Sequence, residues 1–455
     1  MEITPLIVTQ HTHIRTSNTI INNYSYRHIN LLILISVSLG IIVDGIEMTL
    51  MSLFVIPIQS YYNLNQFQMQ VISSVLFLGV AFGSYISSYI VHKYSRTYAL
   101  SMSYNVLLFS HIGLAFSFNY ILFTLFRFII GAALGVIVPV SLNLMSEYIN
   151  DKHTSLLLTS IWAFFSFGQG MQALFMYIGM PNLETNRMKW VIASLVLFII
   201  IAKVVNDKYI MDSPNHLLMR NEHDKAFDIL DTMLTEMNDV PLNDNEKTYM
   251  KQHNVIVIKK EQSSIDELFT EERYIGTLLQ ICLMFILSFI FYGVMLVSTL
   301  TMRSLNLNEL NDVNYTRIIL DQIFVAFISM PGNIIGGILC NIPKVGTKNT
   351  IILGFIISAL CAFAIILFRS NYTTLYSIYL FFVDISFNVC LTYVVETHPI
   401  HLRDTSSGFL FSCLRISGFF SQYLYIALHY WGYLVPYYYS GLLCVIAIII
   451  TYNLN

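Results

Sequence analysis

The sequence is poor in charged residues. Asp, Glu, Lys and Arg make up 11% of its 455 residues, whereas soluble globular proteins carry about 25%. A soluble chain of this length would form roughly two or three domains, each with a charged surface. The net charge is −3 and no basic run is present, which argues against nucleic-acid binding. The composition therefore excludes an ordinary soluble enzyme, a disordered chain and a nucleic-acid-binding protein.

The sequence also lacks the patterns of disulfide, metal and catalytic sites. Its six cysteines lie in apolar runs of the second half, with no CxxC spacing. We expect them to be small buried side chains rather than disulfide partners or metal ligands. There is no phosphate-binding loop, no Ser-His-Asp order and no cluster of metal ligands at usable spacing. We therefore expect no enzymatic activity, no cofactor and no bound metal.

Long apolar runs fill most of the chain instead. Hydrophobic residues make up 56% of it, and the mean hydropathy is +0.64. A membrane-spanning helix needs about 20 predominantly apolar residues. Twelve stretches meet this requirement, at 31–57, 70–91, 98–117, 119–143, 155–178, 189–206, 275–300, 317–340, 349–368, 373–395, 407–428 and 431–452. The pattern predicts a multi-pass protein embedded in a lipid bilayer.

One charged, soluble-like stretch divides the twelve spans into six and six. Between Lys203 and Arg273 lie 9 of the 24 basic and 15 of the 27 acidic residues. Within this stretch, apolar residues recur with helical spacing at 222–237. We predict four segments: a tail at 1–29, a six-helix bundle at 30–206, a linker with short helices at 207–272 and a second six-helix bundle at 273–455.

The basic residues of the short loops predict the orientation. With the N-terminus in the cytosol, the cytosolic loops hold eight Lys and Arg residues and the opposite loops hold five. Cytosolic loops usually carry the excess. We expect both termini and the linker to lie in the cytosol, and the protein to be a monomer. Nothing in the sequence distinguishes the plasma membrane from an organelle membrane.

Three motifs stand at corresponding places of the twelve-span pattern. The stretch 127–140 reads R-x-x-x-G-x-x-x-G-x-x-x-P-V and precedes Glu147, the linker begins D-S-P at 212–214, and 396–408 reads E-x-x-P-x-x-x-R-x-x-x-x-G. Over about residues 30–450 the chain resembles the sugar, organic-ion and synaptic-vesicle-protein-like carriers of the major facilitator superfamily. The resemblance implies an all-α membrane protein with twelve transmembrane helices in two six-helix bundles, the major facilitator fold. It also implies alternating access around a midplane site.

Finer features resemble the branch of synaptic-vesicle two-related proteins, organic-ion carriers and niacin carriers. The first span has D-x-x-E-M at 44–48, the seventh has F-Y-G at 291–293, and the eighth has P-G-N at 331–333. The loop 58–69 is short and uncharged, whereas organic cation and anion carriers usually have a large cysteine-bearing loop there. The chain is therefore not a close member of those two groups.

The loop after the second span departs from the family motif G-x-x-x-D-[RK]-x-G-R-[RK]. The Asp position holds His92, the small Gly is Ser95, and the last basic residue is Thr97. In the second copy, Pro343 and Thr347 replace the Asp and the first Arg. In the family that Asp helps to latch the two bundles together. Its loss leaves open a second hypothesis, a transport-inactive receptor or scaffold of the same fold.

Ionisable residues inside membrane spans are costly and usually functional. Asp44 and Glu47 lie in the first span and Arg127 in the fourth. A helical rise of about 1.5 Å per residue places Asp44 and Arg127 at similar depth. We expect these two residues to form an ion pair that holds the helices together. The alternative is that Asp44, Glu47 and Arg127 form a proton-coupling site, because a buried carboxylate beside a second one takes up a proton more readily.

Two further charged residues, Asp384 and Arg415, fall near the midplane, where substrate sites lie. At the position of Arg415 the family's cation carriers tend to have Asp and its anion carriers Arg, so the resemblance implies an anionic substrate. A guanidinium can hold a carboxylate through two hydrogen bonds. We expect Arg415 to anchor the substrate or to form a salt bridge with Asp384. Both interpretations hold if the substrate competes with Asp384 for Arg415.

Other residues are candidates for lining the pocket or for gating. The pocket candidates are polar or aromatic residues of the spans, for which ordinary packing is the competing interpretation: Trp162, Gln169, Gln172, Tyr292, Asn388 and Tyr393. By resemblance, a set of charged residues at cytosolic helix ends gates the bundles, with surface ion pairs as the alternative: Lys93, Arg96, Glu147, Asp212, Glu396 and Arg403.

We hypothesise a secondary active or facilitative transporter of a small organic solute, namely an organic anion such as an aromatic carboxylate. Coupling to protons is left open. A sugar uniporter also fits the motifs of the fourth and sixth spans, but a neutral sugar has no need of Arg415. The identity of the substrate and the direction of transport do not follow from the sequence.

Overall fold

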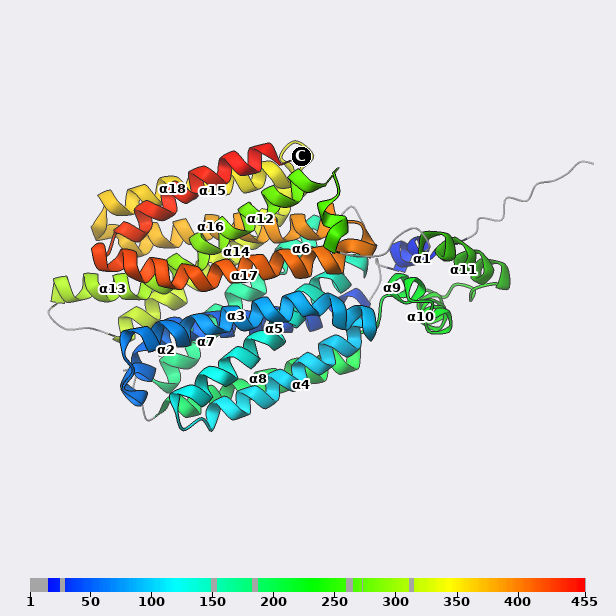
Figure 1. Cartoon of the computed structure of the whole chain (residues 1–455). Coiled ribbons are helices and arrows are strands. Elements are labelled where there is room, and N and C mark those ends of the chain that lie inside the picture. Colours follow the sequence, from blue (N-terminus) through cyan, green and yellow to red (C-terminus); the bar gives the residue numbers. More distant parts are fainter. Residues whose placement is uncertain are drawn as a thin grey trace, which may run out of the picture.

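The computed structural model describes residues 15–24, 29–148, 154–181, 187–258, 265–271, 273–310 and 315–454. Within these ranges every regular element is helical, and the long helices run side by side along one axis (Figure 1). A first group comprises α2 Ile29–Tyr62, α3 Gln66–Lys93, α4 Arg96–Ala115, α5 Tyr120–Tyr148, α6 Thr154–Ser160, α7 Ala163–Gly179 and α8 Met188–Tyr209. A second group comprises α12 Tyr274–Ser288, the π-helical turn η3 Phe289–Gly293, α13 Val294–Leu310, α14 Tyr315–Asn341, α15 Gly346–Leu367, α16 Tyr372–Thr397, α17 Ile400–Trp431 and α18 Val435–Asn453.

The twelve apolar stretches predicted from the sequence are all helical, which confirms the all-α fold class. Nine helical segments of the described chain are long and apolar enough to cross a membrane. The other three stretches are α4, α6 with α7, and α17. Serine, tyrosine and histidine lower the hydropathy of α4, a break interrupts α6 and α7, and α17 carries three charged residues.

Reciprocal glycines bring α3 and α5 into close contact. A Cβ atom on Gly83 of α3 would lie 2.0 Å from the carbonyl oxygen of Ala132, and one on Gly135 of α5 would lie 2.2 Å from that of Val80. Small residues four positions apart allow such an approach between membrane helices. The glycine of the R-x-x-x-G-x-x-x-G motif at position 135 therefore has a packing role.

Replacing Gly83 by leucine is expected to lower the free energy of unfolding by about 1–3 kcal/mol, the usual range for overpacking. The side chain would meet backbone atoms, which cannot move aside without separating α3 from α5. A dye that reacts with cysteine thiols exposed on heating would report the melting temperature. Gly276→Leu is the matched control, because a Cβ there meets nothing within 4 Å. Equal melting of the two variants would contradict the packing role.

The two groups of helices meet along two seams. The helix α3 packs on α17, and α14 packs on α6 and α7. Within each group the helices pack mainly on one another, as α2 does on α7 and α15 does on α16 and α18. This packing agrees with a division into two bundles, and the boundaries given above for the four segments stay a prediction.

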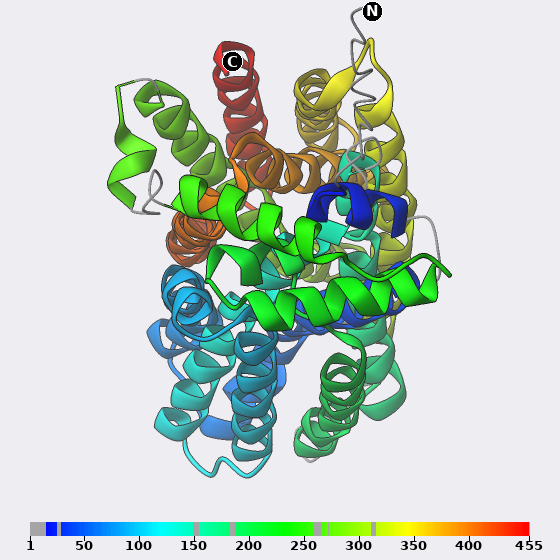
Figure 2. The same cartoon turned by 90° about the vertical axis from the view of Figure 1, so that its right-hand side faces the viewer.

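Short helices cover one end of the bundle, which we call the linker end. They are α1 Ser17–Tyr24, α9 Pro214–Met219, α10 His223–Glu236 and α11 Asp244–Ile258, and they lie across that end in Figure 2. The helix α10 buries Phe227, Leu230 and Met233, on the face that the spacing at 222–237 indicates. Two further short elements are η2 Ile265–Phe269 and η4 Arg369–Asn371.

An ion pair ties the first described residues to the linker. The Arg15 guanidinium donates to both carboxylate oxygens of Glu246, at 2.8 and 3.0 Å, and to the carbonyl oxygens of Val240 and Pro241. Its hydrogen bond lowers the pKa of Glu246 below the ordinary value. The contact is therefore kept at neutral pH and lost in acid, as the pH falls through the lowered pKa of Glu246.

Candidate functional site

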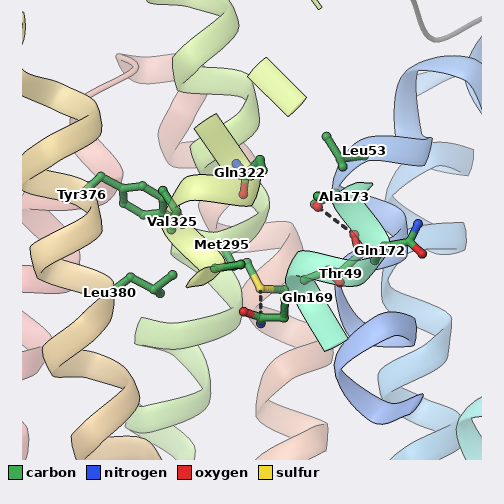
Figure 3. A pocket seen from close by; sticks show the side chains of 12 residues that line it. Thr49, Leu53, Gln169, Gln172, Ala173, Met295, Gln322, Val325, Tyr376 and Leu380 are labelled. Carbon is green, nitrogen blue, oxygen red and sulfur yellow. Dashed lines mark hydrogen bonds between the residues drawn. The ribbon is translucent and has the colours of Figure 1, made fainter. Parts of the chain in front are cut away.

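A small pocket lies between helices of both groups, near the middle of α7 and in the first half of α14 and of α16 (Figure 3). About 20 Å³ of it is open to the centre of a water-sized sphere, which is room for a water molecule. Its twelve lining residues come from five helices: Thr49, Ser52, Leu53, Gln169, Gln172, Ala173, Met295, Gln322, Val325, Ala326, Tyr376 and Leu380. An organic solute fits there only if the two groups of helices separate.

Three glutamines are among the polar side chains of the pocket. The Nε2 atom of Gln169 lies 3.6 Å from the sulfur of Met295, and that of Gln322 donates to the hydroxyl of Ser298. Among the described residues, Gln172 has no hydrogen-bond partner for either amide atom, although it is buried. An unpaired buried amide costs about 1–3 kcal/mol, so Gln172 is suited to bind a polar group of a solute or a water. The sequence-based candidates Gln169 and Gln172 thus both line the pocket.

A break between α6 and α7 is joined to α14 and α16 by side-chain hydrogen bonds. The helix is interrupted at Trp162, whose carbonyl oxygen accepts a hydrogen bond from Asn333 of α14. Asn333 also donates to Ser166 and accepts from Asn388 of α16. Broken helices at membrane depth are usual where a site is built, provided that polar side chains satisfy the freed carbonyls. Trp162 and Asn388, both pocket candidates from the sequence, belong to this support of the site and not to its lining.

A π-helical turn places Tyr292 against α17. Such turns are frequent at functional sites, and this one covers the F-Y-G stretch that carries part of the family resemblance. Gly293 is required there, because a Cβ atom would lie 2.3 Å from the ring of Tyr425. Gln422 donates to the carbonyl oxygen of Tyr292. The turn thereby directs the Tyr292 hydroxyl at Arg415.

Arg415 of α17 connects the two groups of helices. Its guanidinium donates to the hydroxyl of Tyr292 and lies 3.3 Å from the Asp44 carboxylate and 3.4 Å from the sulfur of Met48. Its side chain is 4% exposed, whereas Arg96 and Arg127 are 0% exposed. The expected salt bridge between Arg415 and Asp384 is wrong, because the carboxylate that pairs with Arg415 belongs to Asp44 of α2.

The expected pair of Asp44 and Arg127 is also wrong. Arg127 of α5 donates to Glu47 at 2.7 Å, and the second carboxylate oxygen of Glu47 lies 3.3 Å from the Nε2 atom of His111. All three side chains of this second cluster are buried. His111 of α4 was missed by the sequence analysis, although a lone histidine within an apolar span is a signal that could have found it.

Asp384 of α16 lies apart from both arginine clusters. It is fully buried, and neither carboxylate oxygen is hydrogen-bonded to any group of the described chain. The hydroxyl of Ser329 on α14 is its polar neighbour and donates to the carbonyl oxygen of Ala326. The residue lines no part of the pocket, but it follows Tyr376 and Leu380 at intervals of four along the same helix.

An aromatic layer lies level with Tyr292 on the linker side of the pocket. Ring centroids of Phe291 and Phe387 are 4.6 Å apart, those of Phe165 and Phe291 are 6.2 Å apart, and those of Phe77 and Tyr292 are 4.8 Å apart. The rings come from α7 and α3 in the first group and from η3 and α16 in the second. Packed aromatic rings exclude water, so the layer seals the pocket from the linker end.

A buried ion cluster, which we call the latch, closes the linker end. Arg96 pairs with Glu147 of the first group and donates to Asp404 of α17 at 2.7 Å. Asn143 donates to the other oxygen of Asp404, also at 2.7 Å, and Ser213 donates to Glu147. The latch thus joins both groups to the start of α9. Asp404 was missed by the sequence analysis, because it occupies an open position of the 396–408 motif.

Two neighbours complete the latch. Asp212 accepts hydrogen bonds from the backbone amide and the hydroxyl of Thr97, at 3.0 and 2.7 Å. Arg403 donates to the hydroxyl of Ser146 at 2.9 Å. Burial and the nearby Arg96 lower the pKa of His216 to about 3, so this imidazole in α9 stays neutral at physiological pH.

The remaining sequence candidates lie elsewhere. Lys93 is exposed and lies over the rings of Tyr89 and Tyr94, outside the latch. Glu396 interacts electrostatically with Arg403. Tyr393 lines a separate cavity of about 440 Å³ at the linker end, between α12, α16 and the end of α18.

Comparison with protein families identifies the fold. The family model of the Major Facilitator Superfamily matches residues 37–422. The chain belongs to this superfamily. The resemblance drawn from its motifs is thereby confirmed, and the protein is a membrane transporter of small solutes by family.

Similar proteins come from the branches that the sequence indicates. The chain is 24% identical to organic cation/carnitine transporter 7 of Arabidopsis thaliana, over 84% of this chain and 82% of that protein. It is 23% identical to the synaptic vesicle 2-related protein of Rattus norvegicus, over 84% and 70%, and 23% identical to the niacin transporter NiaP of Acinetobacter baylyi, over 84% and 83%.

A solved structure shows the same fold. The proton:xylose symporter XylE, bound to 6-bromo-6-deoxy-D-glucose, superposes with a TM-score of 0.75 at 15% identity, over 94% of this chain and 96% of that one. The twelve-helix major facilitator architecture predicted from the sequence is therefore confirmed.

Proposed function

We propose that this major facilitator protein carries a small organic anion, such as an aromatic carboxylate, by alternating access. The observation that carries the proposal is the position of Arg415. Its guanidinium lies between the two groups of helices and, within the described chain, is paired with one acidic residue, Asp44. A carboxylate that replaces Asp44 would gain two charge-assisted hydrogen bonds from the guanidinium fork.

Arg415 lies about one helical turn from the pocket. Its partner Tyr292 precedes the lining residue Met295 by three positions, and its contact Met48 precedes the lining residue Thr49. Three residues of helix correspond to about 5 Å. A carboxylate held by Arg415 would therefore place its organic part in the pocket.

Once the two groups of helices separate, the lining of the pocket suits a small ring with a polar substituent. Met295, Tyr376 and Leu380 supply apolar and aromatic surface, and the unpaired amide of Gln172 supplies a donor and an acceptor. The name of the relative NiaP states that it transports niacin, an aromatic carboxylate. This relative supports the proposed class of substrate.

The latch supports transport competence over a receptor role. Asp404 supplies Arg96 with a carboxylate from the opposite group of helices, whereas the loop position that carries Asp in the family holds His92. Breaking this contact would open the linker end, and reforming it would close that end. We infer that the linker end faces the cytosol with both termini, and that the two bundles rock about the pocket.

One observation favours a neutral sugar as a second candidate. Three glutamines, Gln169, Gln172 and Gln322, line the pocket, and amides suit sugar hydroxyls. Such a solute would leave Arg415 paired with Asp44.

Uptake by purified protein in proteoliposomes tests the proposal. We expect uptake of labelled nicotinate, and little uptake of a quaternary ammonium cation or a hexose. Unlabelled nicotinate inside the vesicles should accelerate entry by exchange, which a receptor would not do. Hexose uptake that nicotinate does not inhibit would contradict the anion proposal and favour the second candidate.

A further inference from the structure

Three buried carboxylates lie near the pocket, and their surroundings differ. Asp44 faces Arg415 and Glu47 faces Arg127, so each has a cation that balances its charge. Within the described chain Asp384 has no cation beside it, and its polar neighbour is the hydroxyl of Ser329. A charge without a partner is costly inside a membrane protein. Asp384 is therefore uncharged in this closed arrangement, that is, protonated.

The position of Asp384 connects it to the substrate site. It lies one turn beyond Leu380 on α16, and its neighbour Ser329 lies one turn beyond Val325 and Ala326 on α14. Leu380, Val325 and Ala326 line the pocket. On both helices, therefore, the turn that follows the pocket lining toward the linker end contributes to the surroundings of this buried carboxyl group.

We propose that Asp384 binds the proton that drives solute uptake, a proposal that rests on the proposed anion transport. The sequence pointed to Asp44 and Glu47 for this role. The geometry favours Asp384, because it alone of the three can lose its charge without leaving a buried arginine unpaired.

Few titratable groups face Asp384. Tyr292 of η3 and Tyr376 of its own helix interact with it electrostatically, and Arg415 and Asp44 lie beyond Tyr292. From α14 it meets the Ser329 hydroxyl, and no charged group of the described parts of α6, α15 or α12 acts on it. Because Asp384 is fully buried and outside the pocket lining, a proton reaches it whereas an organic cation does not.

The charge of Asp384 links proton binding to transport of the anion. An ionised Asp384 would be an uncompensated buried charge in the closed arrangement, so the two groups of helices close around the bound anion only when Asp384 is protonated. The anion and the proton therefore bind together. One proton taken up with one monovalent anion keeps the transport step electroneutral, and opening of the linker end would release both.

A proton gradient across proteoliposomes tests this coupling. With an inward gradient of about one pH unit, wild-type protein should accumulate nicotinate up to roughly tenfold, the limit for one proton per solute. Asp384→Asn should abolish the accumulation but retain nicotinate exchange at equal pH, because the variant mimics the protonated state. The matched control is Asp321→Asn, which removes a half-buried carboxylate of α14 that is not part of the pocket lining although it precedes Gln322, and this variant should accumulate nicotinate like wild type.

Proton uptake by the purified protein is a second measurement, which does not depend on reconstituting a variant that folds poorly. Adding nicotinate to wild-type protein in weakly buffered detergent solution should raise the pH, because nicotinate shifts molecules from open arrangements, in which Asp384 is ionised, to the closed arrangement, in which it is protonated. Asp384→Asn should show no change in pH at equal nicotinate binding. Accumulation or proton uptake that persists in Asp384→Asn would overturn the inference while leaving anion transport intact. Wild-type exchange of nicotinate without accumulation would do the same. Wild-type protein that carries no nicotinate would overturn the proposed function, and this inference with it.

Discussion

Arg415→Ala is expected to lower nicotinate uptake by at least about 100-fold. The substitution removes the guanidinium that would hold the carboxylate, and losing one partner of a buried charge pair costs about 2–5 kcal/mol. A 100-fold loss corresponds to about 2.8 kcal/mol. Initial uptake rates in proteoliposomes, normalised to the amount of inserted protein, measure the effect.

Two controls separate binding from folding. The alanine variant leaves the carboxylate of Asp44 buried without its cation, which destabilises the protein by itself. The double variant Asp44→Asn with Arg415→Ala removes that unpaired charge and should melt near the wild-type temperature, yet it should not regain nicotinate uptake. Arg415→Lys keeps the charge but not the fork, and should retain intermediate activity. Uptake restored in the double variant would show that Arg415 has only a structural role.

Arg96→Ala is expected to open the linker end. The guanidinium of Arg96 lies between Glu147 and Asp404, so its removal leaves two buried carboxylates facing each other across the two groups of helices. Breaking a buried pair in this way costs about 3–5 kcal/mol, enough to shift a two-state equilibrium by a factor of about 100 to several thousand, on the order of 1.4 kcal/mol per factor of ten. The closed arrangement should then become the minor state.

Spin labels on the exposed residues Tyr98 and Lys344, in a variant without native cysteines, would measure this shift. The two positions lie at the linker end of different groups, and the distance distribution between them should lengthen in Arg96→Ala. Lys93→Ala is the matched control from the same region, because the Lys93 ammonium lies over the rings of Tyr89 and Tyr94 and outside the latch, and its distance distribution should match wild type. Equal distributions in Arg96→Ala and wild type would show that the latch does not hold the linker end closed.

The sequence predicted the helices well but paired the charges incorrectly. Helical rise sets the depth of a residue, and depth alone placed Asp44 opposite Arg127. Direction around the helix depends on a rotation of about 100° per residue, so Asp44 and Glu47, three positions apart, point about 60° apart. That angle directs Glu47 at α4 and α5 and Asp44 at α17. Directions of this kind follow from how neighbouring helices pack, which a single sequence does not contain.

The latch shows a second limit of local motifs. The loss of the loop Asp at His92 suggested weakened gating. The structure instead shows Asp404, which lies 308 positions from Arg96 in the chain, bound to Arg96. A motif of neighbouring residues cannot reveal a replacement supplied by a distant helix. The pocket amides Gln169 and Gln172, in contrast, could be named from the sequence because they are polar residues inside an apolar span.

The central claim is that Arg415 recognises the carboxylate of an organic anion. Equilibrium binding of labelled nicotinate and nicotinamide to purified protein tests it most directly, because the two share one ring and differ in the charge of a single substituent. We predict saturable nicotinate binding that is at least about 100-fold tighter than nicotinamide binding, with the difference lost in the double variant of Asp44→Asn with Arg415→Ala. Equal binding of both compounds, or a preference for nicotinate that survives in the double variant, would contradict the account.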